Sequence, residues 1–328
     1  MKQLIGITLG KYAPLHKGHE LVIRTAISEM DQVIVIVYNA SDVTKIPTEI
    51  RANWVRQLFP SAQVIIAEDG PQDTGYTDEI KLKQETYLKQ LLNGYDIHSF
   101  YSSEPYGDHV SKALNSRNRM VDLSRSNYPI SASMIRDNVR DYRYMVSEIV
   151  YSDIKPRIAF VGGPSTGKST IALVCANELQ GDHCREYGRD YWMHHQRDHR
   201  LSMWDLEQIA SGHLELEDTA AQGTGDRLFV DTTALTTLAY AYYYFGKASQ
   251  ALIDTFTKFL YRYSLYILCA PDIPFEDTWD RSGPGSRETL QQICLDLLHE
   301  YKLKYYQIGG TLSERVASVK IIMEENKL

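Results

Sequence analysis

The chain has 328 residues, which is long for a single hydrophobic core and comfortable for two domains of ordinary size. Its hydrophobic content of 43% and charged content of 23% are typical of a globular protein, and no run of about 18 apolar residues could span a bilayer. Residues 1–150 carry 17 basic and 18 acidic side chains and residues 151–328 carry 18 and 24, so neither half has the basic excess that binds nucleic acid.

The start of the chain and its cysteines indicate an intracellular protein. Met1 leads within a few residues into a short apolar stretch that does not have the layout of a signal peptide, so we expect a cytoplasmic protein. The cysteines lack the CxxC or Cys/His spacing of a zinc site or a disulfide framework. We therefore predict four buried thiols, at Cys175, Cys184, Cys269 and Cys294.

In the first half of the chain, short apolar runs alternate with helical patterns. Strands are predicted over 5–9, 33–38, 64–67 and 99–102, and helices over 20–30, 51–58 and 81–92. This alternation predicts a parallel sheet whose ligand crevice lies at the carboxyl ends of its strands. Residues 103–107 are predicted to form a site loop, and the polar, tyrosine-rich stretch up to Pro156 a connector.

The same pattern restarts at residue 157. Strands are predicted over 157–161, 226–231, 265–269 and 305–308. One helix is predicted over 168–179, a second follows a loop over 271–287 and runs to about residue 301, and a third ends the chain. The fold class predicted is therefore α/β, with two doubly wound parallel-sheet domains over residues 1–150 and 151–328.

The sharpest motif is GxxxxGKS at the junction of strand 157–161 and helix 168–179, the context that a P-loop requires. Backbone N–H groups of such a loop surround phosphate oxygens, the lysine neutralises β- and γ-phosphate charge, and the serine hydroxyl can bind Mg²⁺. The alternative is a glycine-rich turn. The predicted ATP-binding residues are Gly162, Gly163, Pro164, Ser165, Thr166, Gly167, Lys168, Ser169 and Thr170.

Two further groups in this half are candidate catalytic residues. Asp231 ends the apolar run 228–230, where it could serve Mg²⁺ together with Ser169 or could instead cap a helix that starts near Thr233. Arg281 and Arg287 flank a Gly/Ser/Pro segment and could move onto transferring phosphate as a lid; the alternative is a solvated loop.

The segment 185–190 combines charge, an aromatic residue and a glycine. Glu186 could accept the proton of an attacking ribose hydroxyl, Tyr187 or Trp192 could stack on a flat ring, and Arg189 adds positive charge beside them. From composition alone, an ion-pair cluster at the surface explains these residues equally well.

The first half carries a motif of its own, HxGH, at the end of its first predicted strand. His16 and His19 lie at a helix start, where imidazoles can hydrogen-bond phosphate and stabilise developing charge; Gly18 permits close approach of the backbone. The alternative is two histidines that cap the helix or fill the core. Ser131, Ser133 and Arg136 form a second helix start that could bind an anion.

Together these motifs resemble the NadR family, within the nucleotidylyltransferase superfamily. The resemblance covers nearly the whole chain, and its ordered motifs are GKYxPxHxGH from Gly10, Ile46-Pro47-Thr48 with Arg51 and Trp54, Ser103-Glu104-Pro105, ISASxIR from Ile130, the P-loop, Glu186-Tyr187-Gly188-Arg189 and Val230-Asp231-Thr232. Two residues depart from the family pattern: Ser133 stands where Thr is more common, and Thr233 where an Asp often follows. We expect a form without the helix-turn-helix domain that some members carry.

The resemblance implies a nicotinamide mononucleotide adenylyltransferase domain followed by a ribosylnicotinamide kinase domain, with Mg²⁺ as cofactor and ATP as co-substrate. It assigns ATP in the first domain to Gly10, Lys11, His16, Gly18, His19, Ser131, Ser133 and Arg136, and the nicotinamide nucleotide to Asn39, Arg51 and Trp54. In the second domain, Lys168 and Ser169 serve ATP and Mg²⁺, Glu186 and Tyr187 face the nucleoside, and Asp231 serves Mg²⁺ or acts as the base.

The predicted function is therefore NAD salvage. The kinase would make nicotinamide mononucleotide from nicotinamide riboside and ATP, and the adenylyltransferase would convert it to NAD with release of pyrophosphate. The alternatives are a bifunctional enzyme for another nucleotide-like substrate and a nucleotide-sensing regulator. No nucleic acid or membrane partner is expected, and the sequence leaves a homo-oligomer open.

Overall fold

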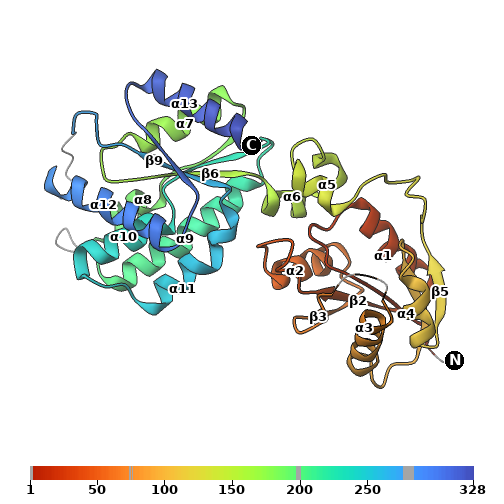
Figure 1. The fold of residues 1–328 in the computed structure, drawn as a ribbon. Helices are drawn as coiled ribbons and strands as arrows, with labels where there is room; N and C mark the ends of the chain where they lie inside the picture. Colours follow the sequence, from red (N-terminus) through yellow and green to blue (C-terminus); the bar gives the residue numbers. More distant parts are fainter. Residues whose placement is uncertain (1–2, 74, 76, 197–200, 276–283) are drawn as a thin grey trace. The chain divides into compact units, whose positions relative to one another are not determined.

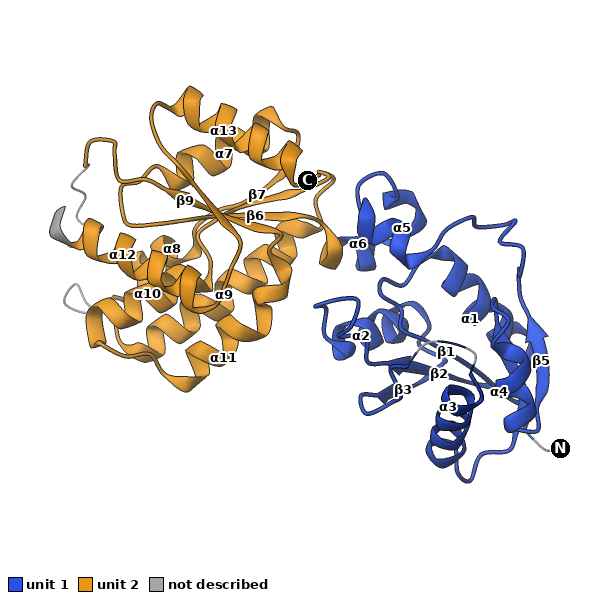
Figure 2. Cartoon of the chain, viewed as in Figure 1, with its two compact units in different colours: residues 1–151 blue, residues 152–328 orange. Residues whose placement is uncertain are grey.

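The computed structural model describes residues 3–73, 75, 77–196, 201–275 and 284–328. Contacts divide the chain into two compact units, Met1–Tyr151 and Ser152–Leu328 (Figure 2). Each unit is built on a five-stranded sheet whose paired strands are all parallel. The predicted α/β class with two parallel-sheet domains is confirmed.

The first unit has the strand order β3-β2-β1-β4-β5. Its elements are β1 (Ile5–Gly10), α1 (Lys17–Glu29), β2 (Gln32–Tyr38), α2 (Thr48–Leu58), β3 (Gln63–Ala67), α3 (Asp78–Leu91), β4 (Ile97–Ser102), α4 (Gly107–Ala113), β5 (Arg117–Met120), α5 (Ala132–Asp137), the 3₁₀ turn Arg143–Met145 and α6 (Glu148–Ile154). The order reverses between β1 and β4, and in such sheets the crevice at this reversal is where ligands bind.

Strand positions alternate between the two faces of this sheet, and helices cover both (Figure 1). Ile7, Ile34 and Ile36 form one buried cluster with Leu88 of α3 and Val110 of α4. Helices α1 and α2 contact strands β1, β2 and β3 as well. Because the sheet is covered in this way, only the loops at the strand ends are left to form a site.

The second unit has the strand order β10-β9-β6-β8-β7. Its elements are β6 (Arg157–Val161), α7 (Lys168–Glu178), β7 (Asp182–Cys184), α8 (Tyr187–His195), α9 (Met203–Ala221), β8 (Leu228–Asp231), α10 (Ala234–Phe245), α11 (Gln250–Phe259), the 3₁₀ turn Leu260–Arg262, β9 (Leu265–Cys269), α12 (Pro284–Glu300), β10 (Tyr305–Ile308) and α13 (Leu312–Glu325). Strand β6 lies between β8 and β9 and is buried along its whole length.

Two hydrophobic clusters flank this second sheet. Ile158 and Phe160 of β6 pack with α7 and α13, whereas Ala159 and Val161 pack with α9, α10 and α12. Figure 1 shows α7 and α13 together on one face of the sheet and α10 to α12 on the other. The predicted buried thiols are confirmed, since all four cysteines are free and buried.

Several predicted boundaries were wrong. The connector before Pro156 is partly helical, because it contains α6, and helices α1, α2 and α3 begin three residues earlier than predicted. Their first turns carry polar and capping residues, which do not continue the apolar pattern on which the prediction rested. No helix among the described residues combines the length and the apolar character needed to cross a membrane.

Candidate active sites

The turn between β1 and α1 places His16 and His19 face to face. Their rings stack with centroids 3.7 Å apart. His16 is the N-cap of α1: its Nδ1 accepts the backbone N–H of His19, and Nδ1 of His19 accepts the backbone N–H of His16. A Cβ at Gly18 would lie 3.1 Å from the His16 ring, so glycine there leaves room for this arrangement.

Burial keeps both imidazoles neutral. It lowers the pKa of His16 to about 4, with the positive charge of Arg125 contributing, and it lowers the pKa of His19 well below the usual value. A neutral ring that accepts at Nδ1 carries its proton on Nε2. Helix capping uses Nδ1 of these rings, which leaves Nε2 for a phosphate. The capping role given above as an alternative is therefore compatible with phosphate binding.

A cavity of about 760 Å³ opens beside these rings, which is within the range of small-molecule sites. Arg125 is a lining residue that the sequence analysis missed; its backbone has φ of 51°, and its guanidinium pairs with Glu104. Ser103, Glu104 and Tyr106 of the predicted site loop also line the cavity. So do all eight residues predicted to bind ATP in this domain: Gly10, Lys11, His16, Gly18, His19, Ser131, Ser133 and Arg136.

Helix α5 joins this site from a distant part of the sequence. Ser131 is its N-cap and accepts the backbone N–H of Met134, and the hydroxyls of Ser131 and Ser133 lie 2.9 Å apart. Arg136 donates to the carbonyl of Ala13 in the β1–α1 turn. This bond holds the two predicted phosphate-binding segments against each other.

The three residues predicted to contact the nicotinamide nucleotide are not brought to this cavity. Trp54 is fully buried in α2. Arg51 is 1% exposed. Its guanidinium donates to the hydroxyl of Thr48 and to the carbonyls of Lys11, Tyr38 and Ile46. These bonds tie the segments that follow β1 and β2 to helix α2. Asn39 bonds to Glu68 and to the backbone of Ser41. In this structure the three residues support the surrounding protein, and their contact with the nicotinamide nucleotide stays a prediction.

In the second unit the P-loop connects β6 to α7. Gly162 has φ of 134° and Gly167 has φ of 81°, values that favour glycine. The Lys168 amine donates to the Gly163 carbonyl at 2.7 Å, while the Gly163 N–H donates to Oε1 of Gln291 at 2.8 Å. Gln291 in turn donates to the carbonyl of Cys269 at the end of β9. The loop is thus fixed to α12 and β9.

Two carboxylates, the partly buried Glu186 and the buried Asp231, lie at the ends of neighbouring strands. Burial raises the pKa of Glu186, and the negative charge of Asp231 raises it further. Burial also raises the pKa of Asp231, while the Ser169 hydroxyl and the charge of Lys168 act in the opposite direction. Perturbed carboxylates in a cleft are typical of functional sites. Thr233, rather than Asp231, caps α10, so the capping alternative for Asp231 is wrong.

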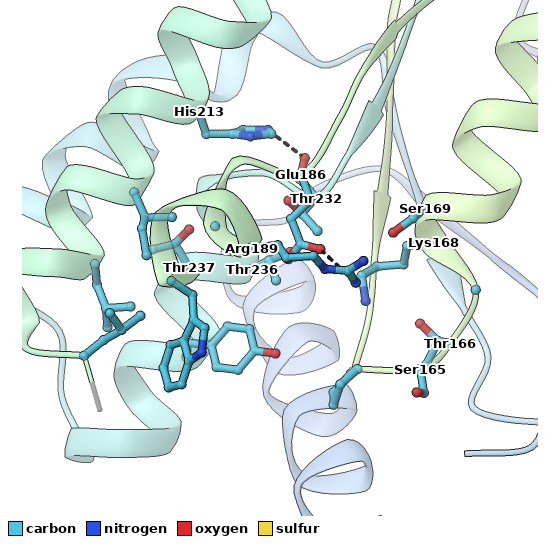
Figure 3. A pocket seen from close by; sticks show the side chains of 18 of the residues that line it. Ser165, Thr166, Lys168, Ser169, Glu186, Arg189, His213, Thr232, Thr236 and Thr237 are labelled. Carbon is cyan, nitrogen blue, oxygen red and sulfur yellow. Dashed lines mark hydrogen bonds and ion pairs between the residues drawn. The ribbon is translucent and has the colours of Figure 1, made fainter. Parts of the chain in front are cut away.

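A cavity of about 460 Å³ lies above the P-loop (Figure 3). P-loop residues 164–170 line it, together with Glu186, Arg189 and Trp192 of the predicted nucleoside site. The polar and tyrosine lining residues that sequence reasoning missed lie on α9, on α10 and between β8 and α10: His213, Thr232, Thr236, Thr237, Tyr240 and Tyr244. Only the left-handed backbone of Thr232, with φ of 68°, marks any of them as unusual, and that is not visible in the sequence.

The remaining predicted residues lie elsewhere. Tyr187 packs beside Gly212 and joins the hydrophobic cluster of α9 and α10, instead of lining the cavity. Arg287 is 7% exposed and donates to the carbonyl of Ile273, a residue that lines the cavity; the lid role predicted for Arg287 stays a prediction. Arg281 lies outside the described residues.

Comparisons with known proteins agree with this division. Residues 7–138 match the cytidylyltransferase-like family and residues 157–315 match a family described as AAA domain. The trifunctional NAD biosynthesis/regulator protein NadR of Escherichia coli K12 is 28% identical over 346 aligned residues, which cover 94% of this chain and 79% of that protein. The protein of the same name from Salmonella typhimurium LT2 is 27% identical, with 98% and 84% covered.

Solved structures show the same fold. A NadR protein in complex with NAD and AMP-PNP aligns with a TM-score of 0.67 at 21% identity, over 100% of this chain and 97% of that one. A NadR protein in complex with NR aligns with a TM-score of 0.66 at 20% identity, over 99% and 96%. This chain is therefore similar to the NadR proteins over nearly its whole length, in sequence and in fold.

Proposed function

We propose that the protein is a bifunctional enzyme of NAD salvage, which phosphorylates nicotinamide riboside and adenylylates the resulting nicotinamide mononucleotide. The observation that carries the proposal is the presence of two separate cavities, one in each unit, of which one is lined by the HxGH histidines and the other by the P-loop. Relatives named as NAD biosynthesis proteins, and related structures with NAD, AMP-PNP and NR bound, support this choice of substrates.

In the first unit, the chemistry proposed is adenylyl transfer. The Nε2–H groups of His16 and His19 donate to oxygens of the α-phosphate and the leaving pyrophosphate, and Arg136 and Lys11 supply positive charge on the same cavity. Both imidazoles are neutral, so they stabilise the developing charge as hydrogen-bond donors and do not transfer a proton. The nucleotide phosphate of the substrate attacks directly, and no covalent intermediate with the protein is needed.

In the second unit, the chemistry proposed is phosphoryl transfer to the ribose hydroxyl. Lys168 and the P-loop amides orient the γ-phosphate of ATP. Glu186, with its raised pKa, accepts the proton of the hydroxyl as the new bond to phosphorus forms. The aromatic side chains of Trp192, Tyr240 and Tyr244 lie along the same cavity, where they offer flat surfaces for the nicotinamide ring.

The second site also fits Mg²⁺. Oδ1 of Asp231 is buried and has no hydrogen-bonding partner within the described part of the chain, and the Ser169 hydroxyl bonds to the same carboxylate. Oxygen ligands of this kind suit a hard cation that keeps several waters and binds substrate phosphates. Ser169 and Asp231 would hold the ion, which when bound supplies neutralisation of phosphate charge.

The test is incubation of the purified protein with nicotinamide riboside, ATP and Mg²⁺, with the products separated by chromatography. Nicotinamide mononucleotide should form first and NAD should follow, together with ADP and pyrophosphate. Parallel reactions with nicotinate mononucleotide and pantetheine phosphate test other substrates of the first unit. Preferred turnover of either would overturn the choice of substrate, and consumption of none would overturn the enzymatic assignment.

A further inference from the structure

Behind the nucleoside half of the kinase cavity lies a buried polar chain that the proposed mechanism does not use. His213 of α9 is 2% exposed and lines the cavity. Its Nε2 lies 3.1 Å from the carbonyl of Thr232 and 3.4 Å from Oε1 of Glu217. Glu217 is fully buried, accepts from the hydroxyl of Tyr263, and pairs with Arg157 at 3.2 Å.

These contacts place a proton on one of the two ring nitrogens. A backbone carbonyl can only accept, so the Nε2 that faces Thr232 carries the proton. In the neutral ring, Nδ1 then presents a lone pair. Nδ1 is buried and has no hydrogen-bonding partner among the described residues. An acceptor left in this state is costly unless a ligand donates to it, and His213 lies on the wall of the cavity.

The position of the ring favours the sugar of the substrate over its base. His213 and Thr232 are hydrogen-bonded, and both line the cavity together with Glu186, so the three residues share one part of it (Figure 3). Thr232 follows Asp231 directly, at the end where phosphoryl transfer is proposed. The donors of a nucleoside at that end are its ribose hydroxyls.

We propose that Nδ1 of His213 accepts a hydrogen bond from a non-reacting ribose hydroxyl, 2′ or 3′, and so makes the kinase selective for ribosides over the corresponding deoxyribosides. The inference rests on the proposed nucleoside kinase function and names a recognition contact of that site. Glu217, Tyr263 and Arg157 act as positioning residues: Glu217 contacts Nε2 of His213, and Tyr263 and Arg157 hold Glu217, so that Nδ1 is left without a partner among the described residues on a ring that lines the cavity.

The test compares kcat/KM for nicotinamide riboside with that for its 2′-deoxy and 3′-deoxy analogues. In the wild-type protein, loss of the recognised hydroxyl should lower kcat/KM by about 10- to 100-fold, since a buried acceptor is left unpaired. In His213→Phe, which has no acceptor, the same deletion should cost less than about 3-fold. His213→Gln retains one donor and one acceptor and should recover part of the selectivity.

His183→Gln is the matched control. His183 on β7 is also partly buried, with an unpartnered Nε2 among the described atoms, but it does not line the cavity, so its selectivity should equal that of the wild type. Should His213→Phe fail to fold, the ¹⁵N resonance of Nδ1 in the wild-type protein, assigned with His213→Gln, replaces it. That resonance should move with the riboside and not with the analogue that lacks the recognised hydroxyl.

Two results would overturn the role of His213 without contradicting the kinase activity. One is equal selectivity in the wild type and in His213→Phe, and the other is an Nδ1 resonance that moves equally with all three nucleosides. Wild-type protein that phosphorylates none of the three nucleosides would instead contradict the proposed function itself.

Discussion

Glu186 is placed where its charge is unfavourable to the folded protein and useful to the reaction. Burial and Asp231 raise its pKa in the folded state above the unfolded value. A carboxyl group with a raised folded pKa costs stability at neutral pH; that cost shrinks as the pH falls below the folded pKa and is gone below the unfolded pKa. Stability and activity therefore oppose each other at this residue.

We expect Glu186→Gln to separate the two effects. The amide keeps the size of the side chain and removes the charge, so kinase turnover should fall by on the order of 10²-fold or more while ATP affinity stays nearly unchanged. The free energy of unfolding should rise by about 0.5–2 kcal/mol, reduced by the loss of the half-exposed contact with Arg189. Steady-state kinetics and chemical denaturation measure both; normal turnover would return Glu186 to an ion-pair role.

The histidine pair of the first unit predicts a pH dependence of stability. Both folded pKa values lie below the unfolded value of about 6.5. The unfolded chain therefore binds more protons, and the free energy of unfolding should fall as the pH drops from about 6.5 toward 4, by at most about 1.4 kcal/mol per pH unit for each ring. Denaturation at pH 7, 6 and 5, compared with the double variant His16→Gln and His19→Gln, isolates this contribution. Parallel curves for the two proteins would contradict it.

At the scale of the element, helix α1 depends on the same side chain as the reaction. His16 caps α1 through Nδ1 and lines the cavity. Asparagine is a good N-cap but cannot present a donor where Nε2 lies. Helix stability and adenylyl transfer should therefore respond differently to different substitutions at this position.

We expect His16→Asn to keep stability within about 0.5 kcal/mol of the wild type while adenylyl transfer falls on the order of 10²-fold. His16→Ala should lose the same activity and, in addition, about 1 kcal/mol of stability. Thermal unfolding and the rate of NAD formation from supplied nicotinamide mononucleotide provide the two readouts. If His16→Asn retained full activity, capping would be the whole role of this residue.

The elements also show how far the sequence could predict the fold. Every strand with an apolar run was found, whereas β5 and β7, with sequences RNRM and DHC, were missed. Both are edge strands of their sheets, where one side lacks a neighbour and polar residues are tolerated. Helix α10 entered the prediction only as the helix that Asp231 could cap, because it is buried on most sides and its sequence lacks the amphipathic period of a surface helix.

For the sites, the sequence predicted the residues carried by contiguous motifs and failed where tertiary structure chooses the side chains. The P-loop and the HxGH turn lie on cavities because local backbone geometry places them there. Arg51 and Trp54 are conspicuous in the sequence, yet α2 turns both into buried positions. The packing of α9 against β8 brings His213 to the kinase cavity, and no sequence motif around this residue predicts that position.

At the scale of the whole molecule, each unit carries its own sheet, its own hydrophobic clusters and its own cavity. Since the phosphate-binding residues of one cavity contribute nothing to the lining of the other, damage to one site should leave the other working. The two activities are expected to be separable by single substitutions.

We expect Lys168→Ala to abolish phosphorylation of nicotinamide riboside and to leave the conversion of supplied nicotinamide mononucleotide to NAD within about 2-fold of the wild type, because the lysine lines the cavity of the second unit and not that of the first. Separate assays of the two half-reactions on the same preparation make the comparison. The corresponding His19→Ala variant, tested in parallel, should show the reverse pattern. Loss of both activities in Lys168→Ala would contradict independent sites.

The contact between Gly163 and Gln291 has a consequence for engineering. The Gly163 N–H is already donated to a side chain 128 residues away, and a Cβ at Gly163 would lie 2.4 Å from the Arg287 carbonyl. The loop 162–169 is therefore not a portable module that keeps its shape on any strand and helix. A designer who transplants the loop into another scaffold must also supply a side-chain amide in the position of Gln291 and a backbone segment that packs against Gly163 as the one at Arg287 does.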